Sequence, residues 1–216
     1  MPKTSDRVSH PMFARIYARV SPRMEDAGFA RRRDQLLRGL HGRVLEVGAG
    51  NGLNFAHYPP EVVEVVALEP EARLRELATA AAASEARVVV RSGVAEHLPA
   101  DDGELDAVVA SLVLCSVPEL DAALSEMFRV VRPGGELRFV EHVCSETAGL
   151  RRVQTGLDAT VWPRLFGGCH LARDTASAIA GAGFVIESID RFDFPDFRPR
   201  LPAAPHILGT AVRPTG

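Results

Sequence analysis

A glycine-rich segment that follows a short apolar run constrains the fold of this chain more than any other stretch. Residues 44–54 read VLEVGAGNGLN, with glycine at positions 48, 50 and 52. Glycine suits a tight turn between a buried strand and a helix, because its missing Cβ permits left-handed backbone angles and the close approach of a ligand. The segment therefore predicts a strand, a turn and a helix start that together form the floor of a nucleotide-like cofactor site.

Strand-like apolar runs recur beyond this turn and alternate with helix-like segments. They cover residues 44–49, 62–69, 86–93, 105–117 and 136–143. Their apolar residues are continuous, which is typical of strands buried on both faces of a parallel sheet. Two further strands at 184–194 and 206–212 are expected to form a closing hairpin. The pattern predicts an α/β fold with a Rossmann-like sheet of about seven strands and helices on both faces.

The N-terminal part of the chain differs from the rest in charge and in pattern. Residues 10–40 are expected to form two helices that break near Ser21-Pro22. We therefore divide the chain into a helical cap at residues 1–41 and a catalytic domain at residues 42–216. Residues 1–43 carry ten Lys and Arg against four Asp and Glu, which makes this segment +6 and the remainder −9. We interpret the charge as a solvated helix face that includes Arg31–Arg33, with weak attraction to an anionic membrane or to nucleic acid as the alternative.

The composition of the chain limits the cellular compartments and the binding partners that can be expected. No run of about eighteen apolar residues is present and the first ten residues have no hydrophobic signal core, so no transmembrane segment is expected. Cys115, Cys144 and Cys169 are far apart and include no CxxC pair, which argues against a disulfide framework and against a structural zinc site. We expect a cytoplasmic protein that binds no metal. Nucleic acid is not expected as a partner, because we interpret the basic N-terminal segment as a solvated helix face.

The spacing of the glycines indicates which cofactor the turn suits. A dinucleotide fingerprint GxGxxG would need glycine at position 53, where this chain has Leu53. Glu46 precedes the turn, and a carboxylate there would attract the cationic amino-acid end of S-adenosylmethionine but repel a pyrophosphate. The turn therefore favours adenosylmethionine over NAD(P). Its predicted cofactor-binding residues are Glu46, Gly48, Gly50, Gly52 and Asn54.

The ends of the following strand-like runs extend the predicted site. Glu69 ends the second run, where its carboxylate could accept hydrogen bonds from both hydroxyls of a ribose. Either cofactor has such a ribose, so Glu69 does not discriminate between them. In SGVAEHLP (92–99), Ala95 is expected beside an adenine ring, and Glu96 is either part of that site or an ordinary surface acid. Pro70 and Ser111 complete the predicted cofactor site.

These residues together resemble the class I S-adenosylmethionine-dependent methyltransferases, whose motifs follow in order as VLEVGAGNG, ALEP, GVAEHLP, LDAVVASLVL and VVRPGGELRFVEHV. A closer resemblance is to the methyltransferase-like subfamily that includes animal alkyl-thiol S-methyltransferases, through NGLNFAHYPP, SLVLCSV, GGCHLARDT and PHILGTAV. The resemblance covers roughly residues 42–213. It implies methyl transfer to a small molecule, with a thiol as one acceptor and a quinol, phenol or amine as alternatives. The broader family usually has an acidic residue where this chain has Val94.

Methyl transfer from a sulfonium depends mainly on alignment, because the donor is already activated by its positive charge. His142 is predicted to face the methyl group and to deprotonate a thiol acceptor, although it could equally be a strand-end residue bonded to backbone. We interpret Cys115 as a core residue, and Tyr17 and Trp162 as candidates for the roof of the acceptor pocket. Two functions of other classes stay open: an NAD(P)-dependent reductase, and a protein that binds adenosylmethionine without turnover.

Overall fold

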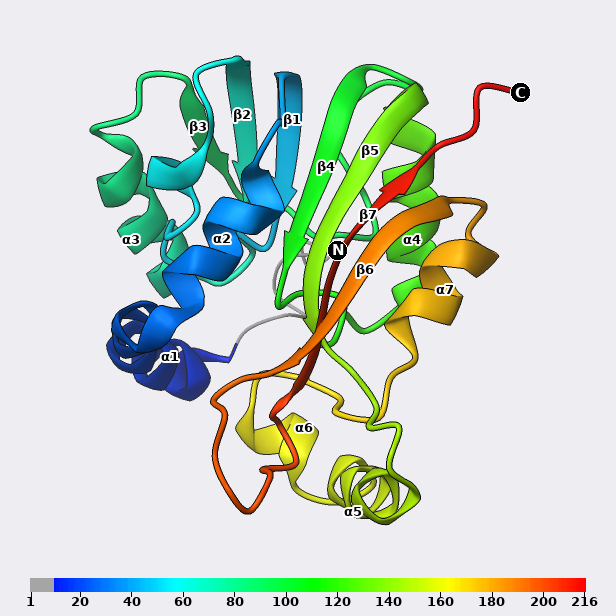
Figure 1. Ribbon diagram of the computed structural model, residues 1–216. Coiled ribbons are helices and arrows are strands. Elements are labelled where there is room, and N and C mark those ends of the chain that lie inside the picture. The colour runs from blue at the N-terminus through cyan, green and yellow to red at the C-terminus, as the bar shows by residue number, and fades with distance from the viewer. Residues whose placement is uncertain (1–9) are drawn as a thin grey trace, which may run out of the picture.

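The computed structural model describes residues 10–216, and a seven-stranded sheet forms its centre (Figure 1). The strand order is β3-β2-β1-β4-β5-β7-β6. β7 runs antiparallel to β5 and β6, and the other pairs are parallel. The strands are β1 Gly42–Val47, β2 Val62–Leu68, β3 Val88–Arg91, β4 Leu105–Ser111, β5 Val131–His142, β6 Val185–Asp193 and β7 Pro205–Val212. The predicted sheet and its closing hairpin are confirmed.

Helices cover both faces of this sheet (Figure 1). Successive residues of a strand point to opposite faces, so apolar side chains from each strand pack against helices on both sides. The helices are α1 Pro11–Met24, α2 Ala30–Leu37, α3 Ala72–Ala82, α4 Leu120–Val130, α5 Ala148–Asp158, α6 Trp162–Leu165 and α7 Thr175–Gly181. Leu45 and Val47 of β1 belong to a core that includes α4 and α7, whereas Val44 belongs to a core that includes α2 and α3. The sheet is therefore buried on both sides, as its continuous apolar runs indicated.

The break between the first two helices lies later than predicted. α1 continues through Ser21-Pro22, and the chain turns in the π-helical segment Glu25–Phe29, where Gly28 has a φ of 108°. A positive φ costs glycine little, so Gly28 permits the turn. Ser21 does not cap a helix: it is buried, and its hydroxyl accepts a hydrogen bond of 3.0 Å from the amide of Asn51. Ser21 thus links α1 to the glycine turn through Asn51.

The predicted cap shares a core with the sheet. Phe29, Leu36 and Leu37 are fully buried and pack in one cluster with Val44. β1 begins at Gly42, next to the boundary that we expected between cap and domain. Because one core spans both parts, the division at residue 41 stays a prediction.

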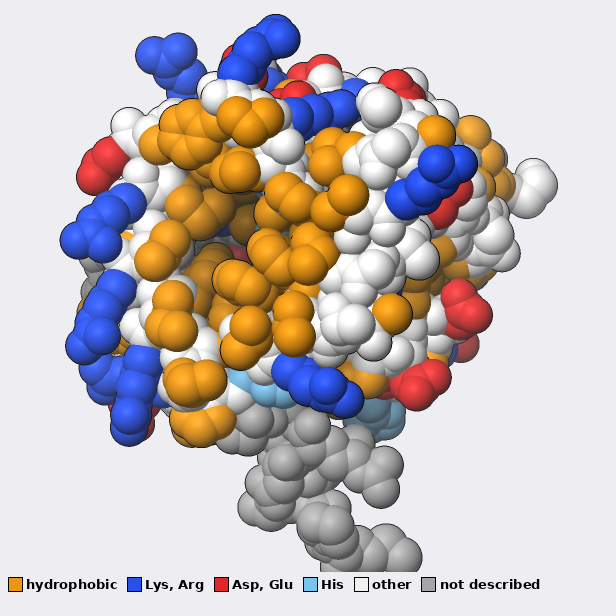
Figure 2. Space-filling view, turned by 90° about the horizontal axis from the view of Figure 1, so that it is seen from below, with side chains coloured by type: hydrophobic (Ala, Val, Ile, Leu, Met, Phe, Trp, Pro, Cys, Tyr) orange, Lys and Arg blue, Asp and Glu red, His pale blue; other side chains and the backbone are white. Residues whose placement is uncertain are grey.

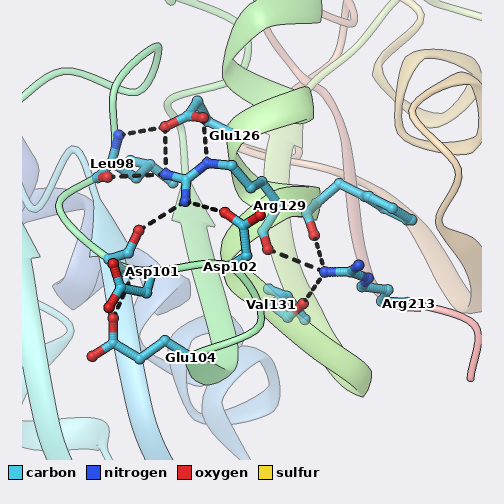
Figure 3. A network of polar contacts seen from close by, with 10 residues as sticks. Leu98, Asp101, Asp102, Glu104, Glu126, Arg129, Val131 and Arg213 are labelled. Carbon is cyan, nitrogen blue, oxygen red and sulfur yellow. Dashed lines mark hydrogen bonds and ion pairs between the residues drawn. The ribbon is translucent and has the colours of Figure 1, made fainter.

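An arginine network fixes the loop after β3 against α4 (Figure 3). Arg129 of α4 pairs with Glu126 at 2.7 Å and with Asp102 at 2.9 Å. The backbone N–H of Leu98 donates to the other Glu126 oxygen at 2.9 Å. Arg213, which follows β7, donates to three carbonyl oxygens at the end of α4, those of Phe128, Arg129 and Val131. The loop that carries Ala95 and Glu96 is therefore held in place by its contacts with Glu126 and Arg129 of α4.

Within residues 10–216, none of the helices combines the length and the apolar character that crossing a membrane requires. Residues 1–9, which include Lys3 and Arg7 and most of the stretch searched for a signal core, lie outside the described part of the chain.

Candidate functional site

A cavity opens at the carboxyl edge of the parallel strands, which is where ligands bind in open α/β sheets. Its empty volume, including the open mouth, is about 870 Å³. The turn after β1, the end of β2, the loop after β3, the segment after β4 and helix α1 supply its walls. Seven of the ten predicted cofactor-binding residues line it: Gly48, Gly50, Glu69, Pro70, Ala95, Glu96 and Ser111.

The glycines of the turn divide into two roles. Gly48 and Gly50 line the cavity with φ values of 65° and 57°. A Cβ on Gly50 would lie 3.3 Å from the ring of Tyr17 across the cavity, and a Cβ on Gly48 would lie 2.4 Å from the side chain of Val113. Gly52 has a φ of 80° but does not line the cavity, and a Cβ there would lie 2.7 Å from the ring of Phe55. Gly52 is therefore needed for the packing of the turn.

Glu69 presents a buried carboxylate to the cavity, with 5% of the residue exposed. One oxygen accepts a hydrogen bond of 2.7 Å from the backbone N–H of Gly50, and the other accepts one of 2.9 Å from Glu71. Burial raises the pKa of Glu69 to about 7, against the effect of these hydrogen bonds. A carboxylate fixed in this way has lone pairs available for a pair of ligand hydroxyls.

Glu46 and Asn54 do not line the cavity and lie behind the glycine turn, so their predicted contact with the cofactor stays a prediction. The carboxylate of Glu46 is fully buried and accepts hydrogen bonds of 2.8 Å from the amide of Asn54 and of 2.8 Å from the hydroxyl of Tyr58. Burial raises the pKa of Glu46 to about 7. The network joins the strand to the chain beyond the turn. Glu46 and Asn54 thus brace the turn from behind.

Arg33 continues this network, and its interpretation as a solvated residue is wrong. It is 4% exposed. Its guanidinium donates to Asn54 at 2.7 Å and to the hydroxyl of Ser111 at 3.3 Å, and it pairs with Glu25 at 3.0 Å. The turn at Gly28 directs α2 so that this side chain reaches the glycine turn. Helical periodicity alone could not reveal partners that lie on other elements.

Helix α1 forms the roof of the cavity. Phe13 and Tyr17 both line it, and their rings stack with centroids 5.6 Å apart. Phe13 packs on Gly167, where a Cβ would lie 2.7 Å from its ring. Tyr17 thus lies over the cavity, and its predicted place above an acceptor stays a prediction. Trp162 does not line the cavity, and its ring stacks on Phe166 with centroids 3.9 Å apart.

His142 ends β5 but does not line the cavity. Its Nδ1 lies 3.7 Å from the sulfur of Cys115 and 3.8 Å from the sulfur of Cys169. Burial alone would lower the pKa of His142, but Cys169 and the charge of Glu141 raise it overall. The hydrogen bond from Cys115 lowers the pKa of Cys169. The role of His142 as a base at the methyl group stays a prediction, and its immediate neighbours are protein thiols.

Glu141, which we did not single out from the sequence, holds the segment after β4 that contributes Val113 to the cavity wall. It is fully buried, and its carboxylate accepts three backbone N–H bonds at 2.9, 2.9 and 3.1 Å. The donors are consecutive residues after β4, namely Val113, Leu114 and Cys115. An acidic residue within the apolar end of a strand was the available signal, because a buried charge needs such partners.

Comparisons with known proteins agree with this geometry. Residues 45–139 match the family model of a methyltransferase domain. Thiol S-methyltransferase TMT1B of Mus musculus is 36% identical over 207 residues, which cover 93% of this chain and 82% of the relative. Thiol S-methyltransferase TMT1A of Homo sapiens is 35% identical over 175 residues, which cover 79% of this chain and 70% of the relative. The chain belongs to the class I methyltransferases. Like them, it is an enzyme of adenosylmethionine-dependent methyl transfer.

Solved structures show that this methyltransferase shares its fold with enzymes of different names. The [4+2]-cyclase SpnF matches with a TM-score of 0.71 at 21% identity, over 87% of this chain and 81% of that one. A geranyl diphosphate methyltransferase in complex with SAM matches with a TM-score of 0.65 at 13% identity, over 87% of this chain and 85% of that one. Since one of these neighbours is named as a cyclase, the fold alone does not determine the reaction.

Proposed function

We propose that this methyltransferase transfers a methyl group from S-adenosylmethionine to a small-molecule thiol. The observation that carries the proposal is the buried carboxylate of Glu69 beside the glycine turn, at the wall of a cavity on the carboxyl edge of the sheet. The thiol as acceptor is supported by the names of the relatives. A quinol, phenol or amine is the alternative acceptor.

The residues around the cavity fit the parts of adenosylmethionine. Glu69 would accept hydrogen bonds from the ribose hydroxyls, and Gly48 and Gly50 would leave room for the amino-acid end. Ala95 and Glu96, in the loop held against α4, would border the adenine ring. When bound, the cofactor would supply a methyl group on a positively charged sulfur.

The rest of the chain would act by alignment and by exclusion of water. Phe13 and Tyr17 roof the cavity above the turn, so an acceptor beneath them would be held in a fixed approach to the methyl group. Well-oriented reactants of this kind gain up to about 7–11 kcal/mol. A dedicated base is therefore not required for the main part of the rate, although a thiol must lose its proton to attack.

The cysteines support a cytoplasmic site of action, which we propose together with the thiol acceptor. Cys115, Cys144 and Cys169 are all free thiols. Free thiols persist in reducing compartments, where small thiol acceptors are also reduced.

A screen of acceptors tests the proposed reaction. The purified chain is incubated with labelled adenosylmethionine and with thiols, phenols, quinols and amines at equal concentrations. We expect adenosylhomocysteine to form fastest with a thiol. A higher rate of adenosylhomocysteine formation with a quinol, a phenol or an amine would show that the acceptor belongs to that class instead. Binding of adenosylmethionine without product from any acceptor would indicate a binding protein, and oxidation of NADPH would indicate a reductase.

A hydrophobic face surrounds a hollow at the end of the molecule where α1, α5 and α6 lie (Figure 2). On α1, the hydrophobic residues Met12, Ile16 and Val20 are 63%, 49% and 42% exposed. Exposed arginines recur at the same spacing of four on this helix, at positions 15, 19 and 23. Apolar side chains beside arginines suit the surface of an anionic bilayer. We propose that this face makes weak peripheral contact with such a membrane.

Replacing Ile16 by glutamate should reduce this contact several-fold, because it places a negative charge between the exposed apolar side chains of Met12 and Val20 on α1. The measurement is co-flotation with vesicles of phosphatidylcholine and phosphatidylserine. Val63→Glu is the matched control. Val63 is also exposed, at 66%, but it lies at the start of β2, at the edge of the sheet opposite to the cavity. Absence of flotation for the unaltered chain, or an equal loss in the control, would argue against the contact.

A further inference from the structure

Three side chains with metal-binding atoms converge beside the cavity. Cys115 follows β4, His142 ends β5, and Cys169 follows α6. Their ligand atoms all lie within 4.8 Å of one another. The two sulfurs lie 3.7 Å and 3.8 Å from Nδ1 of His142. These residues are far apart in the sequence, so only the fold brings them together.

The separations suit a tetrahedral metal ion. Zinc binds thiolate sulfur at about 2.3 Å and imidazole nitrogen at about 2.0–2.1 Å. With tetrahedral angles, these bond lengths place a sulfur and a nitrogen ligand about 3.6 Å apart. The observed separations differ from this value by about 0.1–0.2 Å. The two sulfurs lie within 4.8 Å of each other, and a tetrahedral ion would hold them about 3.8 Å apart, so side-chain adjustments of about 1 Å or less would admit the ion.

The backbone holds each ligand in place. The N–H of Cys115 donates to Glu141 at 3.1 Å, and its carbonyl oxygen accepts from His170 at 2.7 Å. The N–H of Cys169 donates to Phe166 at 3.1 Å, and His142 lies in the β5–β7 ladder. Fixed ligands of this kind reduce the cost of ordering a site when the ion binds.

The indole of Trp162 gives a second, independent indication. It packs against the cluster that Cys115 and Cys169 form with Leu171. Its buried N–H has no acceptor at normal distance within residues 10–216, but a weaker interaction with the sulfur of Cys169 helps to lower the pKa of that thiol. A buried donor without an acceptor is costly. A metal-bound thiolate carries negative charge, so Cys169 would become a stronger acceptor for this N–H, as ligands with outer hydrogen-bond partners do in metal sites.

We propose that Cys115, His142 and Cys169 bind one thiophilic metal ion, Zn²⁺, and leave its fourth position open. Thiolate and imidazole ligands favour zinc over magnesium or calcium, which prefer oxygen. Three protein ligands with an exchangeable fourth position are typical of catalytic zinc sites. The ion would lie just behind the cavity wall, because Ser116 lines the cavity and its hydroxyl lies 3.5 Å from the sulfur of Cys115.

The chain offers a matched control for this proposal. Cys144 is a free cysteine outside the cluster. The full chain is dialysed against Zn²⁺ under reducing conditions, and bound metal is measured by mass spectrometry. We expect a single Zn²⁺ in the unaltered chain and in Cys144→Ser. Affinity should fall at least about tenfold in Cys115→Ser, Cys169→Ser and His142→Gln, with circular dichroism to confirm that each variant is folded.

A second measurement decides the question in the unaltered chain, whether or not the variants fold. Co²⁺ replaces Zn²⁺, and thiolate ligation is read from the sulfur-to-cobalt charge-transfer band. We expect that band in the unaltered chain, together with its loss on addition of excess Zn²⁺. Failure to retain Zn²⁺, absence of the band, or equal binding in folded Cys115→Ser and Cys144→Ser would each overturn the proposal.

Discussion

Replacing Glu69 by alanine should weaken the binding of adenosylmethionine by about 10- to 100-fold, as measured by isothermal titration calorimetry. The carboxylate would accept hydrogen bonds from the two ribose hydroxyls, and hydrogen bonds to charged groups contribute about 1.5–3 kcal/mol. Its loss also leaves the N–H of Gly50 without its acceptor in the turn. Glu64→Ala is the matched control, because this carboxylate lies on the same strand but pairs with Arg43 at the surface. Unchanged affinity in Glu69→Ala would exclude the ribose assignment.

The same residue predicts how binding depends on pH. Burial raises the pKa of Glu69 to about 7 in the free protein. Ribose hydroxyls donate to the ionised carboxylate, so binding should lower this pKa and release a proton. Affinity should therefore rise as the pH is raised through about 7, and it should change little with pH in Glu69→Gln. A similar pH dependence in the variant would assign the effect to another group.

Replacing Glu141 by leucine should lower the free energy of unfolding by about 3–5 kcal/mol, because three backbone N–H groups lose their acceptor in a buried site. The measurement is equilibrium unfolding in urea. Glu136→Gln is the control, since Glu136 lies on the same strand and pairs with Arg138 in a partly exposed position. That change should cost less than about 1 kcal/mol. A loss in Glu141→Leu no larger than in the control would show that the carboxylate does not hold the segment after β4.

The fold could be predicted because its signals are local and repeated. Each buried strand is a continuous apolar run, a pattern that can be recognised within a few residues of sequence. Local sequence also located the cavity residues of the glycine turn and Glu69. A glycine-rich turn and a carboxylate at the end of a strand can be recognised without knowledge of distant contacts. The helix break at Gly28 was misplaced, since Ser21-Pro22 offered a stronger local signal.

The rest of the site depends on contacts between distant segments. Arg33 resembles its arginine neighbours in sequence, and only the turn at Gly28 directs it to Asn54. Cys115 and Cys169 have no spacing that indicates a shared site, so the sequence argued against a metal, whereas the fold places both beside His142. The order of residues along the chain does not indicate these contacts, because it is the sheet topology that brings the distant segments together.

The most direct test of methyl transfer to a thiol follows the methyl group itself. The unaltered chain is incubated with adenosylmethionine that carries a trideuterated methyl group and with the best thiol from the acceptor screen, and the product is analysed by mass spectrometry. We predict an S-methylated thiol that contains three deuterium atoms, formed in equal amount with adenosylhomocysteine, and little product with Glu69→Ala at low cofactor concentration. A thiol that gains no label while the cofactor is bound, or a label that appears on an oxygen or nitrogen acceptor instead, would contradict the proposed function.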